Sequence, residues 1–86
     1  MNEVTEKLAG EVTNFFSRIS VAGIDLSAPV KVGDNLHFKG ATTDFTEIVE
    51  SMQIDRNQVT EAKAGDAIGI KVKMEVRKGD KVYLVK

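Results

Sequence analysis

Apolar and polar residues alternate along much of the chain, with the period of two that is typical of β-strands. The alternation is clearest over residues 67–74, which predict a strand. Its inward positions are expected to be Ile68, Ile70, Val72 and Met74. The same reasoning predicts strands over residues 11–16, 21–26, 35–39, 58–60 and 82–84. The chain is therefore expected to fold mainly as β-sheet.

Residues 43–54 are long for one strand, and their apolar positions change phase. Phe45 and Val49 share one face, whereas Ile48, Met52 and Ile54 share the other. We expect a bulge or sharp bend near Thr46-Glu47 to re-aim these side chains. Residues 61–64, just before a glycine, predict a single helical turn.

The dipeptide Gly-Asp occurs three times, as Gly33-Asp34, Gly65-Asp66 and Gly79-Asp80. Each copy follows a lysine by one or two residues and precedes a β-like segment. Glycine tolerates a positive φ, and aspartate bonds readily to nearby backbone. Each dipeptide therefore predicts a tight turn that leads into a strand.

Six or seven short strands with one apolar face must bury that face, and closing the sheet on itself is the economical way to do so. We therefore predict an all-β fold, a small closed six- or seven-stranded β-barrel. A chain of 86 residues forms one domain. We place that domain at residues 10–86, with residues 1–9 as an N-terminal extension.

The sequence holds no cysteine, so disulfides and thiolate metal sites are not expected. No apolar run reaches the ~18 residues that a membrane-spanning helix needs. The first ten residues are acidic and lack the apolar core of a secretory signal. We expect a cytoplasmic protein that does not bind membranes.

Catalytic motifs are not found in the sequence. The only histidine, His37, alternates with Leu36 and Phe38 and is expected to be an exposed strand residue. Glu47 and Glu50 are expected to be surface charges rather than an acid–base pair. Neither a phosphate-binding P-loop nor a dinucleotide-binding glycine motif is present. We therefore expect a protein that is not an enzyme and binds no metal, cofactor or nucleotide.

Charge is distributed unevenly along the chain. Residues 1–70 carry six lysines and arginines against eleven carboxylates, whereas residues 71–86 carry six against two. An anionic partner such as RNA would therefore meet the C-terminal segment. The candidate nucleic-acid-binding residues are Lys71, Lys73, Arg77, Lys78 and Lys81. The competing interpretation is a solvated strand face that binds nothing.

Three aromatic residues are candidates for contact with a protein partner. Phe15 and Phe16 are adjacent, so on a strand one of them faces away from the core. The outward ring is either covered, with Val4 and Leu8 as candidates, or available to a partner. Tyr83 is out of phase with its apolar neighbours and is expected on the surface.

Several segments in order resemble domain 2 of elongation factor Tu and its relatives among the translational GTPases. These segments are VAGIDLSAPVKVGD at 21–34, NLHFKG at 35–40, VESMQI at 49–54, EAKAGDAIGIKV at 61–72 and VRKGDKVY at 76–83. The chain is most similar to short stand-alone elongation factor-like proteins. The resemblance implies a six- or seven-stranded Greek-key barrel but transfers no GTPase activity. A similar barrel forms the C-terminal part of some collagenase-like peptidases.

Two functions follow from these observations. The first is a translation-associated binding module that contacts tRNA, rRNA or a ribosomal protein through the basic residues named above. The alternative is an accessory barrel that docks on a partner enzyme, such as a collagenase-like peptidase, through Phe15, Phe16 and Tyr83.

Overall fold

The computed structural model describes residues 6–85 and contains ten strands. They are β1 (Glu6–Phe16), β2 (Val21–Leu26), β3 (Val30–Lys31), β4 (Asn35–Lys39), β5 (Asp44–Ile48), β6 (Met52–Ile54), β7 (Asn57–Val59), β8 (Glu61–Ala62), β9 (Ala67–Lys71) and β10 (Lys81–Val85). The described residues form no helix, and so none that could cross a membrane. The all-β class predicted from the alternation is confirmed.

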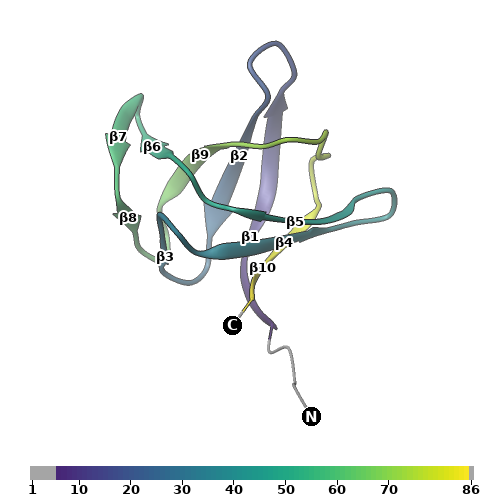
Figure 1. The fold of residues 1–86 in the computed structure, drawn as a ribbon, viewed down its shortest axis with the longest axis horizontal. Helices are drawn as coiled ribbons and strands as arrows, with labels where there is room; N and C mark the ends of the chain where they lie inside the picture. The colour runs from purple at the N-terminus through teal and green to yellow at the C-terminus, as the bar shows by residue number, and fades with distance from the viewer. Residues whose placement is uncertain (1–5, 86) are drawn as a thin grey trace.

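Eight strands form one antiparallel sheet in the order β5-β4-β10-β1-β2-β9-β6-β7. The sheet curls strongly, which brings its two ends, β5 and the β6–β7 pair, toward each other (Figure 1). Its two edge strands, β5 and β7, are not paired with each other. The predicted closed barrel is therefore wrong, because the sheet is open.

A separate two-stranded sheet, β3 with β8, lies between the edge strands. Backbone bonds join it to both sides of the opening: Val32 N–H donates to the Thr60 carbonyl, and Gly33 N–H donates to the Val49 carbonyl. Val30 and Ala62, which are paired in this small sheet, are both buried. The apolar face is thus covered without a continuous hydrogen-bonded ladder, which is why the strands need not close into a barrel.

The core consists of side chains from the concave face of the sheet and from the connections that cover it. Its largest fully buried members are Phe38, Ile24, Leu36, Met52, Ile70, Val12, Val30, Val49, Val76 and Val82. The alternation therefore identified most of the core correctly, but not Met74, whose side chain is 56% exposed. The reason is that β9 ends at Lys71 and the chain leaves the sheet, so Val76 rather than Met74 is buried.

Two other local predictions also differ from the structure. Residues 43–54 form two strands separated by residues 49–51, and β5 pairs with β4 without a bulge at Thr46-Glu47. The phase change is produced by a break in the ladder instead. Residues 61–64 form β8 and the start of a turn rather than a helical turn.

Strand β1 begins at Glu6, four residues before the predicted start of the domain. Residues 1–5 lie outside the described part of the chain. The register of β1 is interrupted between Leu8 and Gly10, opposite β10, and between Val12 and Asn14, opposite β2. These irregularities allow one long strand to pair with two differently inclined neighbours.

The three Gly-Asp turns are confirmed and share one geometry. Gly33, Gly65 and Gly79 have φ values of 97°, 96° and 95°, in the region that favours glycine. In each turn the aspartate N–H donates to the carbonyl three residues earlier, and its carboxylate accepts the N–H of that same residue. The residue three positions earlier is Lys31, Lys63 or Arg77.

Each turn is also bonded to one buried residue on a different segment. Gly33 N–H donates to the Val49 carbonyl, and Val49 N–H donates to the Asp34 carbonyl. Gly65-Asp66 bonds in the same reciprocal way to Leu26, and Gly79-Asp80 to Val12. Every Gly-Asp dipeptide therefore reverses the chain and also attaches the turn to the core.

The burial of the three aspartates predicts unequal effects on stability. Asp80 is 5% exposed, whereas Asp34 is only half-buried. Removing the Asp80 carboxylate would leave the part-buried Arg77 N–H without its acceptor, so Asp80→Ala should cost about 1–3 kcal/mol of unfolding free energy. Asp34→Ala should cost less, because water can reach the Lys31 N–H. Urea unfolding of both variants tests this prediction, and equal losses would contradict it.

Candidate functional site

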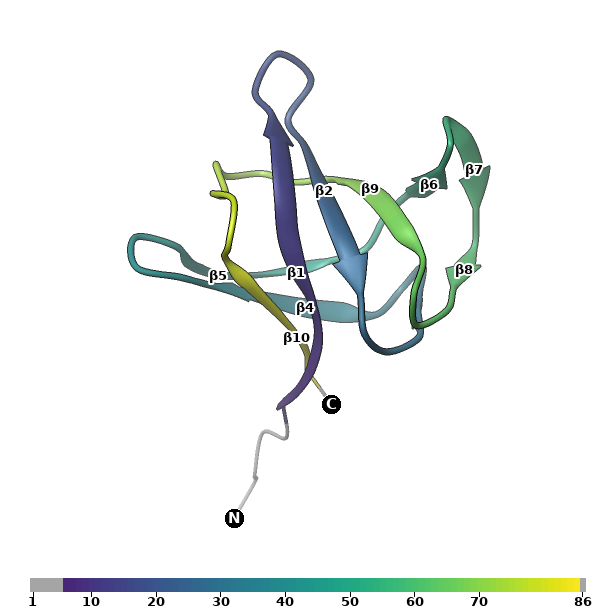
Figure 2. The same cartoon turned by 180° about the vertical axis from the view of Figure 1, so that it is seen from behind.

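The β1–β2 hairpin projects beyond the rest of the sheet (Figure 2). Exposed apolar side chains lie at its end. Phe16 closes β1 and is 48% exposed, and Ile19 in the connecting turn is 60% exposed. The turn is held by a bond from Ile19 N–H to the Phe16 carbonyl and by Ser20, whose φ is 55°. Both side chains are therefore held outward by the local backbone.

A hollow of about 420 Å³ lies beside this hairpin, and we call it the hairpin groove. Phe16 and Ile19 form one side of it, and the β6–β7 turn with Asp55 and Arg56 forms the other. The two turns stand on either side of β9 in Figure 2. The groove lies on the convex face of the sheet, away from the core.

The floor of the hairpin groove contains two glycines that face each other across the sheet. Gly23 on β2 is paired directly with Gly69 on β9. Asn14 on β1 is paired with Gly23, and Gln53 on β6 is paired with Gly69. A carboxamide thus stands at each end of a strip where the backbone carries no side chain.

The predicted protein-interaction residues do not form one surface. Phe16 lines the hairpin groove, but Phe15 faces the opposite way and packs against the core. Tyr83 lies on β10 and is paired with Leu8 on the distant end of β1. Leu8 is itself 47% exposed and does not cover Phe16, and Val4 lies outside the described residues.

The predicted nucleic-acid-binding residues lie along the path from β9 to β10. Lys71 ends β9, Arg77 and Lys78 belong to the third Gly-Asp turn, and Lys81 begins β10. Lys81 Nζ donates to Glu11 Oε1 at 2.8 Å, and this bond raises the pKa of Lys81. Lys73 lies beside Glu47 and Glu50, and its backbone N–H donates to the Glu47 carboxylate. Two of the five basic residues, Lys73 and Lys81, therefore lie next to carboxylates.

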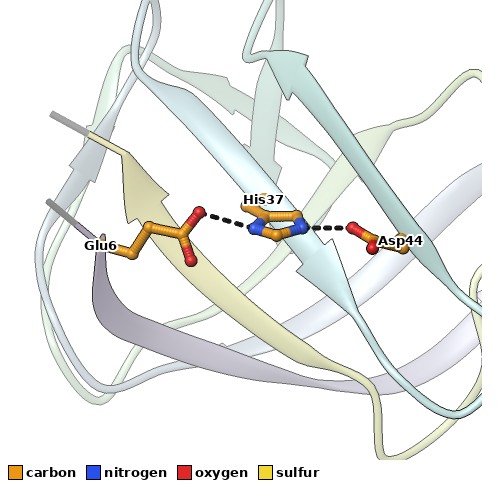
Figure 3. A network of polar contacts seen from close by, with 3 residues as sticks. All are labelled: Glu6, His37 and Asp44. Carbon is orange, nitrogen blue, oxygen red and sulfur yellow. Dashed lines mark hydrogen bonds and ion pairs between the residues drawn. The ribbon is translucent and has the colours of Figure 1, made fainter. Parts of the chain in front are cut away.

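His37 is not the simple exposed strand residue that the sequence predicts. Its side chain is 15% exposed and lies between two carboxylates (Figure 3). Nδ1 is 2.7 Å from Glu6 Oε2, and Nε2 is 2.5 Å from Asp44 Oδ1. The Tyr83 ring is its aromatic neighbour, with ring centroids 6.3 Å apart. The group links β1, β4 and β5 across the sheet.

Protonation of His37 is favoured by this arrangement. The hydrogen bond with Asp44 is the largest cause that raises the pKa of His37, and Glu6 adds to it, while partial burial opposes both. The same bond lowers the pKa of the Asp44 carboxyl. An imidazolium donates from both nitrogens, so neither nitrogen is free to act as a base or a metal ligand. Within residues 6–85, no cluster of three or more metal-binding side chains occurs.

Comparisons with known proteins connect the chain to peptidases. No family model matches the sequence. The chain is 45% identical over 78 residues to an uncharacterized protease of Methanocaldococcus jannaschii, a match that covers 90% of the chain. It is 34% identical over 76 residues to a collagenase of Porphyromonas gingivalis, covering 86% of the chain. The chain spans about a fifth of the length of these relatives.

Solved structures give the same connection at the level of the fold. The C-terminal domain of a Geobacillus thermoleovorans protein classed with the U32 peptidases superposes with a TM-score of 0.85, covering 90% of each chain at 20% identity. Its selenomethionine variant gives 0.84, covering 88% of this chain and 96% of the other. The fold is therefore that of this C-terminal domain.

The predicted kinship with stand-alone elongation factor-like proteins is wrong. The relatives found by sequence are a protease and collagenases, and the matching fold is that of a peptidase C-terminal domain. The turn glycines that suggested elongation factors are required by the turns themselves, so they occur wherever such turns connect short strands. The translation-associated role has no support from these comparisons.

Sequence reasoning identified Phe16 but missed the other parts of the hairpin groove. Ile19 falls between the strands predicted over residues 11–16 and 21–26 and carries no signal of its own. A glycine in the interior of a strand often marks a close approach by a ligand or another chain. Gly23 and Gly69 both lie in predicted strands, and this signal was present in the sequence.

The ionic group around His37 predicts a pH-dependent stability. Because the pKa of His37 is raised on folding, its contribution is complete below about pH 6.5 and is lost as the pH rises through the folded pKa. Because the pKa of Asp44 is lowered, its contribution is complete above about pH 3.8 and is lost as the pH falls through the folded pKa. The network should therefore stabilise the protein most between these two values.

Urea unfolding of the wild type and of His37→Gln, from below the ordinary pKa of Asp44 to well above that of His37, measures the effect, and the variant should lose the decline in stability on the alkaline side. An NMR titration of the ring gives the pKa directly. A histidine that titrates at or below its ordinary value would contradict the ion network.

Proposed function

We propose that this chain is a non-catalytic docking module that binds the catalytic part of a collagenase-like peptidase. The relatives support this proposal, because the region similar to this chain is about a fifth of a longer protease or collagenase. The remaining four-fifths of those proteins offer ample length for a separate catalytic unit. The chain would then act by binding rather than by chemistry.

The absence of a catalytic role is part of the proposal. The chain has one histidine and no cysteine, and the histidine nitrogens are both engaged by carboxylates. A nucleophile activated by a free imidazole or thiolate therefore has no counterpart here. A binding role is thus supported without reference to the activity of any relative.

The exposed β1–β2 hairpin is the observation that carries the proposal. Phe16 and Ile19 are held outward beside a groove, and because each is about half exposed, complete burial against a partner would gain about 1 kcal/mol for each. Large exposed apolar groups that border a hollow are typical of interaction sites. That the basic residues Lys71, Lys73, Arg77, Lys78 and Lys81 bind RNA remains a prediction from charge alone.

Binding to a defined protein tests this function. The probe is the M. jannaschii protease expressed without the region that matches this chain, and binding is measured by calorimetry. The double variant Phe16→Ser/Ile19→Ser should weaken binding at least about tenfold, because two anchoring side chains are removed. Folding of the variant is checked by its amide NMR spectrum.

A matched control uses the similarly exposed Ile48 and Met74, which do not line the hairpin groove and are 58% and 56% exposed. Ile48→Ser/Met74→Ser should bind as the wild type does. The proposal fails if the wild-type chain does not bind the protease fragment. Equal losses in the two double variants would show that this hairpin is not the docking surface.

A further inference from the structure

The hairpin groove combines an apolar side with a floor that lacks side chains. Phe16 and Val21 lie on one side, and the backbone of Gly23 and Gly69 is partly exposed between them and the β6–β7 turn. A flat floor beside an aromatic ring suits a planar group, which can contact the peptide planes and the edge of Phe16 together. The volume, about 420 Å³, is sufficient for one large side chain and its flanking backbone.

Of the two floor glycines, Gly23 is not required by the fold, whereas a Cβ at Gly69 would come within 3.3 Å of Val21 Cγ1, which is a tight contact. Neither has a positive φ, in contrast to the glycines of the three turns. A side chain at Gly23 would meet only ordinary contacts, the nearest being Thr13 Oγ1 at 3.5 Å. At Gly10, by contrast, a side chain would collide with the Asp25 backbone. Glycine weakens a strand interior, so its presence at position 23 has a reason outside the sheet.

One cation lines the groove, and two others lie on the segments beside it. Arg18 is in the β1–β2 turn, Arg56 is in the β6–β7 turn, and Lys71 lies two residues beyond Gly69 on the same strand face. Among residues 6–85, none of these three forms an ion pair. Asp55 is the one carboxylate in the groove lining. Asp25, two residues beyond Gly23 on the same face of β2, is a second carboxylate beside the groove, so the three cations exceed the two carboxylates by one and favour a negatively charged partner.

Two carboxamides complete the chemistry of the site. Asn14 and Gln53 stand at the ends of the glycine strip, where an extended chain crossing the floor would pass. Asn14 Oδ1 accepts the Phe15 N–H, which orients its amide group. Carboxamides donate and accept, so they can bond to both the N–H and the carbonyl of a peptide backbone.

We propose that the hairpin groove binds an extended acidic segment of the partner polypeptide, with an aromatic side chain lying on the Gly23–Gly69 floor and flanking carboxylates beside Arg18 and Arg56. This inference rests on the proposed docking function and specifies the chemistry that the docking face recognises. The aromatic group supplies apolar contact, the carboxylates supply charge complementarity, and the carboxamides hold the backbone between them.

Short blocked peptides test the proposed chemistry directly. The probes are Ac-Glu-Phe-Glu-NH₂, Ac-Lys-Phe-Lys-NH₂ and Ac-Glu-Ala-Glu-NH₂, each added to the intact chain and followed by amide chemical shifts. The first should shift the amides of Gly23 and Gly69 and bind at least about tenfold more tightly than the other two. Arg56→Glu should remove the preference for the acidic peptide.

A variant that fills the floor supplies the structural control. Gly23→Val should keep the fold, because a Cβ there would make only ordinary contacts and β-branched residues favour strands, but it should abolish the peptide-induced shifts. Thr46→Val, which places the same side chain at an exposed position on β5, should leave them unchanged. Thermal unfolding of both variants checks that the fold is retained.

The outcomes separate this inference from the docking function. If the protease fragment binds wild type and Gly23→Val equally, while Phe16→Ser/Ile19→Ser loses binding, docking stands and the groove chemistry is overturned. If no peptide shifts the groove amides, the groove chemistry is likewise overturned. If a single-stranded uridine hexamer shifts the groove amides and the acidic peptide does not, the groove binds nucleic acid. That result would also overturn the proposed groove chemistry.

Discussion

The structure depends on one repeated interaction, the reciprocal bonding of each Gly-Asp turn to a buried residue of another segment. The turn at Gly33-Asp34 bonds to Val49, that at Gly65-Asp66 to Leu26, and that at Gly79-Asp80 to Val12. Because a left-handed glycine and an aspartate carboxylate set the turn, the backbone groups point at the core residue without further strain. Three such attachments hold together strands that are distant in the sequence.

These attachments explain how an open sheet can enclose a core. Gly33-Asp34 joins the end of β3 to the residue after β5, so the opening between the edge strands is bridged by turn bonds and by the β3–β8 pair. A closed barrel would need a ladder between β5 and β7, and short bridging contacts make that ladder unnecessary. The convex face of β2 and β9, where the hairpin groove lies, is then not needed to enclose the core.

The two polar features of the surface have different roles. The His37 group satisfies both nitrogens of a protonated ring with carboxylates from two other strands, and it therefore acts on stability. The arginines around the hairpin groove have no such partners among residues 6–85, and they border apolar side chains. The relatives, in which a comparable segment is a fifth of a longer protease or collagenase, are consistent with a module whose exposed face meets another domain.

The sequence alone was sufficient for the β class, the three turns and most of the core, because alternation and turn chemistry depend on neighbouring residues. It could also indicate Phe16 as a surface ring, since adjacent residues on a strand face opposite sides. Sheet closure, the end of β9 before Met74, the His37 partners Glu6 and Asp44 and the Gly23–Gly69 pair depended on the tertiary structure. Each of these joins segments far apart in the chain, so strand order and register decide it, and local pattern carries no information about either.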